Sequence, residues 1–280
     1  MHAASFLDAL LLGAFGLLIG SFLNVAIFRL PKMLERQWKN ECAEMTGGAL
    51  EQTERFNLMV PRSRCPSCNH QIRWFENVPV VSYVFLRGKC SACGTGISWR
   101  YPLVELANSA LFAYCGWRWG ATATGAAYCL LSAALLTAAL IDWDTTLLPD
   151  DITLPLIWAG LIAASMGWTT ATLSDAVWGA IAGYMCLWLI FWGFKLLTGK
   201  EGMGYGDFKL LAALGAWFGW TSLIQILLMS SVIGACVGIV MKFSSGLREG
   251  GYMPFGPFLA GAGLFSMVAG SDAMLRFVGL

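Results

Sequence analysis

Charged side chains are scarce in this sequence: 12% of its 280 residues are Asp, Glu, Lys or Arg, whereas an ordinary soluble domain has about a quarter. With a hydrophobic share of 57%, this scarcity excludes a cytosolic globular enzyme and an intrinsically disordered chain. An excess of positive charge is also lacking, since 18 Lys and Arg residues balance 17 Asp and Glu residues. Nucleic acid is therefore excluded as a partner. What remains is an integral membrane protein in a lipid bilayer.

Long apolar runs are what the sequence has in abundance. A hydrocarbon core about 30 Å thick requires about 20 mostly apolar residues in a helix. Six clear stretches approach this length, at residues 6–28, 122–141, 152–168, 176–197, 222–241 and 256–274. Two marginal stretches, 103–117 and 208–220, contain Glu105 and Lys209. We therefore predict an all-α polytopic membrane protein with about eight transmembrane helices.

Lys and Arg residues are distributed asymmetrically around these stretches. Segment 29–100 holds eleven of the 18, and five more lie on the same side of the membrane if every stretch crosses it. Only Arg118 and Arg276 fall on the other side. Because cytoplasmic segments are enriched in Lys and Arg, this distribution predicts that both termini lie outside and that segment 29–100 is cytoplasmic.

The predicted helices divide the chain into three parts. The first transmembrane helix occupies residues 1–28, and a small cytoplasmic loop domain follows at 29–102. Residues 35–57 of this loop are polar and contain glycines, which favours a flexible entry segment. The rest, 103–280, is predicted to be a transmembrane core of about seven helices.

Two Cys-x-x-Cys pairs lie in the loop domain, Cys65 with Cys68 and, 21 residues later, Cys90 with Cys93. Two intervening residues let both sulfur atoms of a turn converge on one ion, and two such turns complete a closed tetrahedral thiolate site. The pattern predicts a structural Zn²⁺ site. A pair of disulfides is the alternative, which a reducing cytoplasm disfavours. His70 could replace one sulfur, but we expect it to stand beside the site.

Two acidic motifs stand at the ends of predicted core helices. Asp142 directly follows the stretch 122–141. Asp207 directly precedes the stretch 208–220 and comes after Gly204 and Gly206. The predicted topology places both aspartates at the cytoplasmic face, where carboxyl groups are candidates for function. Two neighbouring carboxyl groups cannot easily ionise together, so the pair would hold one proton near neutral pH. Such a pair could hydrolyse a peptide bond by acid–base catalysis, and the glycines would let a substrate strand approach closely.

Simpler interpretations of these acidic residues stand beside the catalytic one. Asp142 alone could be an interfacial charge, and Asp144 a solvated neighbour or a supporting polar group. Asp150 or Asp151, which follow Pro149, could cap the next helix. A transporter could use the same carboxyl groups as a proton relay, although the sequence shows no repeated halves. A non-catalytic zinc-bearing scaffold would leave the two aspartates without a role.

Motifs spread over nearly the whole chain point to one family. They are GSFLNV at 20–25 with RLP at 29–31, the two cysteine pairs, ISWRYP at 97–102 before Glu105, the segment 142–150, and GYGD at 204–207. With these motifs the sequence resembles the bacterial type IV prepilin peptidases, which are bifunctional leader peptidases and N-methyltransferases. The GYGD motif also resembles the GxGD signature of a wider class of intramembrane aspartyl proteases.

The resemblance implies a peptidase activity with assigned residues. Asp142 and Asp207 would be the catalytic aspartates, with Gly204, Gly206 and Asp144 in supporting places. The substrates implied are prepilins and pseudopilins, whose positively charged leader is removed at the cytoplasmic face of the bacterial inner membrane. The basic leader and apolar helix of such a substrate would place the scissile bond at that interface.

The resemblance implies a methyltransferase activity as well. The new amino terminus would be N-methylated with S-adenosylmethionine as the donor, and the family associates this step with the cytoplasmic loop, including Gly88 and Lys89. The chain lacks a Rossmann-like methyltransferase pattern. A GxGD membrane protease without methyltransferase activity is therefore the alternative, beside a transporter that relays protons through its carboxyl groups.

Overall fold

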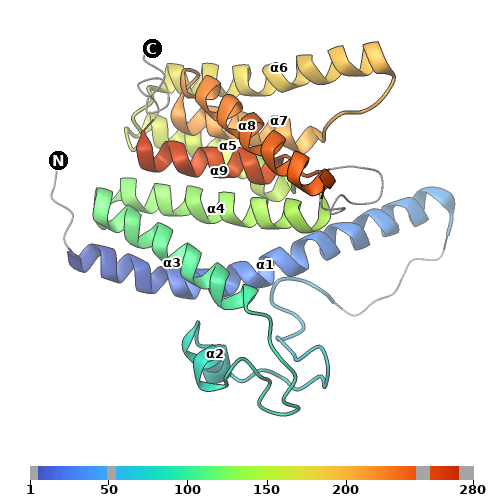
Figure 1. Cartoon of the computed structure of the whole chain (residues 1–280), viewed down its shortest axis with the longest axis vertical. Helices are drawn as coiled ribbons and strands as arrows, with labels where there is room; N and C mark the ends of the chain where they lie inside the picture. Colours follow the sequence, from blue (N-terminus) through green and yellow to red (C-terminus); the bar gives the residue numbers. More distant parts are fainter. Residues whose placement is uncertain (1–5, 49–54, 244–252, 271–280) are drawn as a thin grey trace. The chain divides into compact units, whose positions relative to one another are not determined.

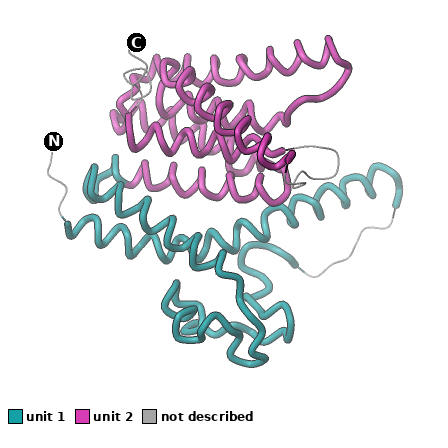
Figure 2. Tube along the Cα trace, viewed as in Figure 1, with its two compact units in different colours: residues 1–125 teal, residues 126–280 magenta. Residues whose placement is uncertain are grey.

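A computed structural model of the chain describes residues 6–48, 55–243 and 253–270. Within these ranges the regular secondary structure is helical (Figure 1). Two isolated β-bridges lie in the cysteine-containing loop. The chain divides into two compact units, Met1–Gly125 and Ala126–Leu280 (Figure 2). Each unit is built around its own set of packed helices.

Two long helices of the first unit, α1 (Phe6–Thr46) and α3 (Arg100–Trp119), pack against each other through small residues. A Cβ atom on Gly16 would lie 2.8 Å from Cβ of Phe112, so the close approach requires glycine there. Asn108 Nδ2 donates to the Gly16 carbonyl at 2.7 Å, and Ser109 Oγ donates to the Gly13 carbonyl at 2.8 Å. Small residues with hydrogen bonds between helices are typical of association within a membrane.

The loop between α1 and α3 contains the short helices η1 (Trp74–Asn77) and α2 (Val81–Phe85). Two buried charged side chains fasten it to the long helices. Arg29 of α1 donates to the carbonyl groups of Asn57 and Pro61, at 2.9 and 2.6 Å. Glu105 of α3 accepts a hydrogen bond from the Val80 N–H at 2.7 Å. This contact explains how the marginal stretch 103–117 accommodates an acidic residue.

The expectation of a flexible segment over residues 35–57 is wrong for residues 35–46. The helix α1 continues through Pro31 to Thr46, well beyond the apolar run (Figure 1). Its polar extension includes a side-chain hydrogen bond of 2.8 Å from Gln37 to Glu41, and side-chain pairs four residues apart stabilise a helix. Residues 49–54 lie outside the described residues.

The second unit is a helical bundle arranged around one short, buried helix. Its helices are α4 (Ala123–Thr145), α5 (Asp150–Ser165), α6 (Leu173–Thr198), α7 (Tyr205–Phe218), α8 (Ser222–Phe243) and α9 (Gly256–Ala269). The helix α7 packs against α5, α6, α8 and α9. From Asp207 to Phe218 every residue of α7 except Lys209 is buried.

The burial of α7 explains how so short a helix belongs to a membrane protein. Fourteen residues rise only about 21 Å, less than the bilayer core of about 30 Å. Neighbouring helices rather than lipid surround α7, so it need not match the bilayer alone. Its one basic residue, Lys209, donates to Asp150 Oδ1 at 2.6 Å, which explains the charge in the marginal stretch 208–220.

Close backbone contacts fix α7 against its neighbours. A Cβ atom on Gly179 of α6 would overlap the carbonyl oxygen of Gly215 of α7, so the two helices cross at backbone contact. On another side, Trp217 Nε1 donates to the Leu156 carbonyl of α5 at 2.9 Å. The Trp217 ring also packs against Tyr128 of α4, with ring centroids 5.9 Å apart.

Among the described residues, four helices are long and apolar enough to cross a membrane: α1, α4, α6 and α8. Each of the eight predicted stretches overlaps a helix of the structure, α2 and η1 being additional short helices of the loop. The prediction of an all-α polytopic membrane protein is therefore confirmed.

The α6–α7 crossing leads to the first testable expectation. The variant Gly179→Ala should lose about 1–3 kcal/mol of stability, because the added methyl group forces α6 away from the α7 backbone. Gly193→Ala on the same helix is the matched control, since a Cβ there meets no atom within 4 Å. Thermal unfolding in detergent compares the two variants. Equal melting temperatures would contradict this account of the crossing.

Candidate active site and metal centre

Two buried carboxyl groups lie at helix ends in the second unit. Asp142 stands in the last turn of α4 and Asp207 in the first turn of α7, and their residues are 4% and 6% exposed. The two carboxyl groups are close enough to interact electrostatically. Residues 65 positions apart in the sequence are thus brought close together.

Glycine residues let the backbone close around this pair. A Cβ atom on Gly206 would lie 2.5 Å from Cβ of Leu148, so the start of α7 packs directly on the segment that follows α4. The N–H of Gly256, the first residue of α9, donates to Asp142 Oδ2 at 2.9 Å. Leu148 also lies against Gly256. The Leu148 side chain therefore packs against Gly206, which precedes Asp207, and against Gly256, which bonds Asp142.

Asp207 presents an oxygen atom whose hydrogen-bonding capacity is unused within the described residues. Its Oδ1 is buried and has no hydrogen-bond partner. Buried polar atoms are almost always bonded, so this unsatisfied oxygen is a candidate contact for a bound water or substrate. A carboxyl pair with one free buried oxygen can hold a proton and transfer it, which is the chemistry of an acid–base catalyst.

An aromatic cluster holds the start of α7 against α6. Tyr205 and Phe208 pack on Phe191 with ring centroids 5.1 and 5.6 Å away. Gly204 is the N-cap of α7, and the N–H of Asp207 donates to its carbonyl at 3.3 Å. The predicted supporting glycines therefore lie in the turn that delivers Asp207 into the bundle.

The other acidic residues of the motif differ from the pair in their surroundings. Asp144 is exposed on α4. The expectation that Asp150 or Asp151 caps the next helix is wrong, because Pro149 is the N-cap and no side-chain cap hydrogen bond is present. Asp150 instead makes an ion pair with Lys209, a contact that ties α5 to α7.

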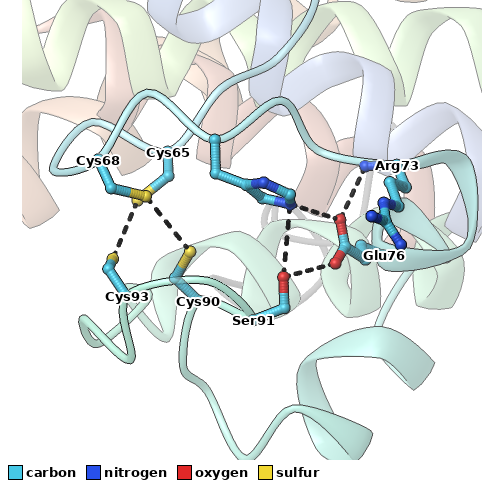
Figure 3. A network of polar contacts seen from close by, with 8 residues as sticks. Cys65, Cys68, Arg73, Glu76, Cys90, Ser91 and Cys93 are labelled. Atoms are coloured by element: carbon cyan, nitrogen blue, oxygen red, sulfur yellow. Dashed lines mark hydrogen bonds and ion pairs between the residues drawn. The ribbon is translucent and has the colours of Figure 1, made fainter.

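The four predicted cysteines form one cluster in the loop of the first unit (Figure 3). All four Sγ atoms lie within 4.8 Å of one another. Across the two turns, Cys65 is 3.8 Å from Cys93 and Cys68 is 3.9 Å from Cys90. Tetrahedral metal–sulfur bonds of about 2.3 Å place the sulfur atoms about 3.8 Å apart. These separations fit a tetrahedral metal ion and are too long for the alternative of two disulfides.

A polar clamp beside the cluster joins three parts of the loop. Glu76 accepts hydrogen bonds from Ser91 Oγ at 2.5 Å and from the Arg73 N–H at 2.8 Å (Figure 3). His70 Nε2 lies 3.3 Å from the same carboxylate, so this residue stands beside the sulfur cluster, as expected. Because Ser91 lies between Cys90 and Cys93, the clamp holds the second cysteine turn in place.

The clamp determines the protonation of Glu76. The Ser91 hydroxyl, then the Arg73 N–H and His70, stabilise the carboxylate and lower its pKa from 4.5 to about 2. Burial acts in the opposite direction but is weaker. The carboxylate therefore stays charged at any physiological pH.

Gly88 and Lys89 lead into the second cysteine turn. Gly88 has a positive φ of 66°, and a Cβ atom there would lie 2.9 Å from the Tyr83 hydroxyl oxygen. Lys89 forms an isolated β-bridge with Gly96. Within the described residues Gly88 thus shapes the turn, and Lys89 lies directly before Cys90.

Some residues of these sites were not predicted. Glu76, Ser91 and Gly256 contribute to these sites through hydrogen bonds to residues distant in sequence. No sequence spacing predicts such hydrogen bonds. For Gly256 a weak signal was present, because Pro254 and Pro257 flank it at the start of an apolar run.

Comparison with protein families assigns both halves of the chain. The bacterial peptidase A24 N-terminal domain matches residues 14–119, and the type IV leader peptidase family matches residues 129–239. No solved structure matches the chain.

Curated proteins resemble the chain over nearly its full length. A prepilin leader peptidase/N-methyltransferase of Stutzerimonas stutzeri is 52% identical, over 94% of this chain and 91% of the relative. The protein of the same name from Pseudomonas aeruginosa is 51% identical, over 94% and 92%. That of Aeromonas salmonicida is 48% identical, over 99% and 95%.

The polar clamp leads to a testable pH dependence. Because the pKa of Glu76 is lower in the folded loop, its stabilising effect is complete above pH 4.5 and disappears as the pH falls towards about 2. Glu76→Gln should therefore increase hydrogen exchange in residues 70–96 at pH 6, and the difference from the unmodified protein should shrink at pH 3. Glu35→Gln on the exposed part of α1 is the control. A difference that stays constant with pH would contradict the charged clamp.

Proposed function

This chain belongs to the type IV leader peptidase family, and from that premise we propose that it is a bifunctional membrane enzyme. It cleaves the leader from type IV prepilins and pseudopilins and then methylates the new amino terminus. The observation that carries the peptidase assignment is the buried pair of Asp142 and Asp207, which approach each other from the ends of α4 and α7.

The pair supports peptide hydrolysis by proton transfer. One aspartate, as carboxylate, takes a proton from water while the water oxygen attacks the carbonyl carbon of the scissile bond. The other, as carboxylic acid, donates its proton to the carbonyl oxygen. The tetrahedral diol then collapses: the C–N bond breaks, the amine nitrogen takes the proton from the first aspartate, and a diol hydroxyl returns one proton to the second. The pair ends with the single proton with which it began.

The location of the reaction follows from charge and substrate chemistry. We place the carboxyl pair and the cysteine loop on the cytoplasmic side of the bacterial inner membrane, because sixteen of the 18 Lys and Arg residues fall on that side of the predicted topology. The loop domain is then residues 29–102, between a first membrane helix and the helical core at 103–280. A substrate with a basic leader and an apolar helix would present its scissile bond at this interface.

The methyltransferase activity rests on the curated relatives, whose names include it. The donor we propose is S-adenosylmethionine, and the residues we associate with the step are Gly88 and Lys89 at the entrance to the second cysteine turn. The positive φ of Gly88 and its contact with Tyr83 support a requirement for glycine at this position. A peptidase without methyl transfer remains the competing assignment.

The ion we propose for the cysteine cluster is Zn²⁺. A tetrathiolate shell with all positions filled by protein is typical of structural zinc, and the sulfur separations of 3.8 and 3.9 Å fit its geometry. Cys65, Cys68, Cys90 and Cys93 would hold the ion, which would stabilise the loop fold.

Metal content checks this assignment. The purified protein should contain about one zinc ion per chain by mass spectrometry, and Cys90→Ser should lose most of it because one ligand is removed. Cys42→Ser is the matched control, since Cys42 is an exposed cysteine on α1 outside the cluster. Active protein free of metal, or a Cys90 variant with full zinc content, would contradict the site.

Substitution of the aspartates tests the peptidase assignment. Asp142→Asn and Asp207→Asn should each lower leader cleavage at least about 100-fold, because asparagine can neither accept nor donate the transferred proton. Asp151→Asn, an exposed position in the first turn of α5, should retain cleavage. The measurement is cleavage of a prepilin in detergent or lipid, followed by gel mobility.

Methylation provides the internal control for these variants. Both aspartate variants should still methylate a substrate that already lacks its leader, as judged by the mass of the amino-terminal peptide. Full cleavage by either variant would exclude that residue from the reaction. An unmodified amino terminus in the presence of S-adenosylmethionine would favour the peptidase without methyl transfer.

A further inference from the structure

The start of α9 makes a specific contact with the carboxyl pair. The N–H of Gly256 donates to Asp142 Oδ2 at 2.9 Å, and both groups are buried. The first N–H groups of a helix have no partner within the helix, so this donor is available to a side chain. The helix N-terminus also carries a partial positive charge, which attracts a carboxylate.

The position of Gly256 admits no side chain. A Cβ atom there would lie 2.6 Å from Asp142 Oδ2 and 3.0 Å from Leu148 Cδ1. Gly256 does not have a positive φ, so space rather than backbone torsion requires glycine. The hydrogen bond and the steric limit are independent observations, and both concern the same carboxylate oxygen.

We propose that Gly256 is a positioning residue for peptide hydrolysis. Its N–H holds Oδ2 of Asp142, so that the carboxyl group keeps its position near Asp207. The proposal rests on the proposed peptidase function and extends it to a third helix. The active site is then built from α4, α7 and α9, and α9 contributes a backbone donor instead of a side chain.

The size of the expected effect follows from geometry. A misplacement of about 1 Å in a catalytic group can reduce the rate about 100-fold. In Gly256→Ala the methyl group must displace the Asp142 carboxyl from its observed position. We expect kcat for leader cleavage to fall about 100-fold while KM changes less than about threefold, because the substitution displaces a reacting group and leaves the apolar surfaces of the bundle unchanged.

Gly261→Ala is the matched control on the same helix. A Cβ atom on Gly261 meets no atom within 4 Å, so kcat should stay within about twofold of the unmodified protein. Thermal unfolding and methylation of substrate without leader are measured for both variants. An unchanged kcat in a folded Gly256→Ala variant would overturn the proposal.

A second substitution separates positioning from general packing. Leu148→Ala removes the other atom that an alanine at position 256 would meet. If the carboxylate is the affected group, Gly256→Ala should reduce kcat by the same factor in the Leu148→Ala background as in the unmodified protein. If this factor falls to near one, the defect lies in packing against Leu148 and the positioning role is wrong.

An amide-to-ester change tests the donor without any added atom. Replacing Gly256 with glycolic acid deletes the N–H and leaves the space unchanged, so it applies even where the alanine variant does not fold. A hydrogen bond to a charged group corresponds to about a 10- to 100-fold effect, and kcat should fall by this factor. A full kcat for the ester would overturn the proposal. Absence of cleavage by the unmodified protein would instead refute the proposed function.

Discussion

Two carboxyl groups buried side by side in an apolar bundle are the constraint on which the second unit depends. A buried carboxylate is costly unless it is paired or hydrogen-bonded. The surroundings of Asp142 and Asp207 meet this requirement only in part: a backbone N–H of α9 bonds Asp142, whereas Oδ1 of Asp207 has no bonding partner among the described residues. Stability alone does not explain such an arrangement. The helix α7, enclosed by its neighbours and in backbone contact with α6, holds Asp207 in this position.

Much of the fold was predictable because long apolar runs are an unambiguous signal. The charges in the two marginal stretches could be explained only from the structure. Lys209 is paired with Asp150, and Glu105 accepts a hydrogen bond from the Val80 N–H. These partners lie 59 and 25 residues away in the sequence. The extension of α1 to Thr46 was not predicted. Its many charged and polar side chains suggested a loop, although Leu34, Trp38 and Met45 recur at helical spacing.

The two sites were predictable to different depths. The cysteine spacing alone indicated the cluster, since two residues between ligands are a local geometric requirement. The two aspartates were selected as candidates because carboxyl groups at membrane depth are rare. The residues around them were not found, because Gly256 acts through its backbone and Glu76 through hydrogen bonds that span the loop. A backbone donor can belong to almost any residue type, so the glycine and its flanking prolines were only a weak signal.

The fastening of the loop to the long helices of the first unit has a consequence for a two-step enzyme. Arg29 holds the loop at Asn57 and Pro61, and Glu105 holds it at Val80. Contacts at these three positions tie the loop to both long helices, so it cannot move there independently of α1 and α3. Any rearrangement of the loop at these points therefore has to break the contacts or displace α1 and α3 with it.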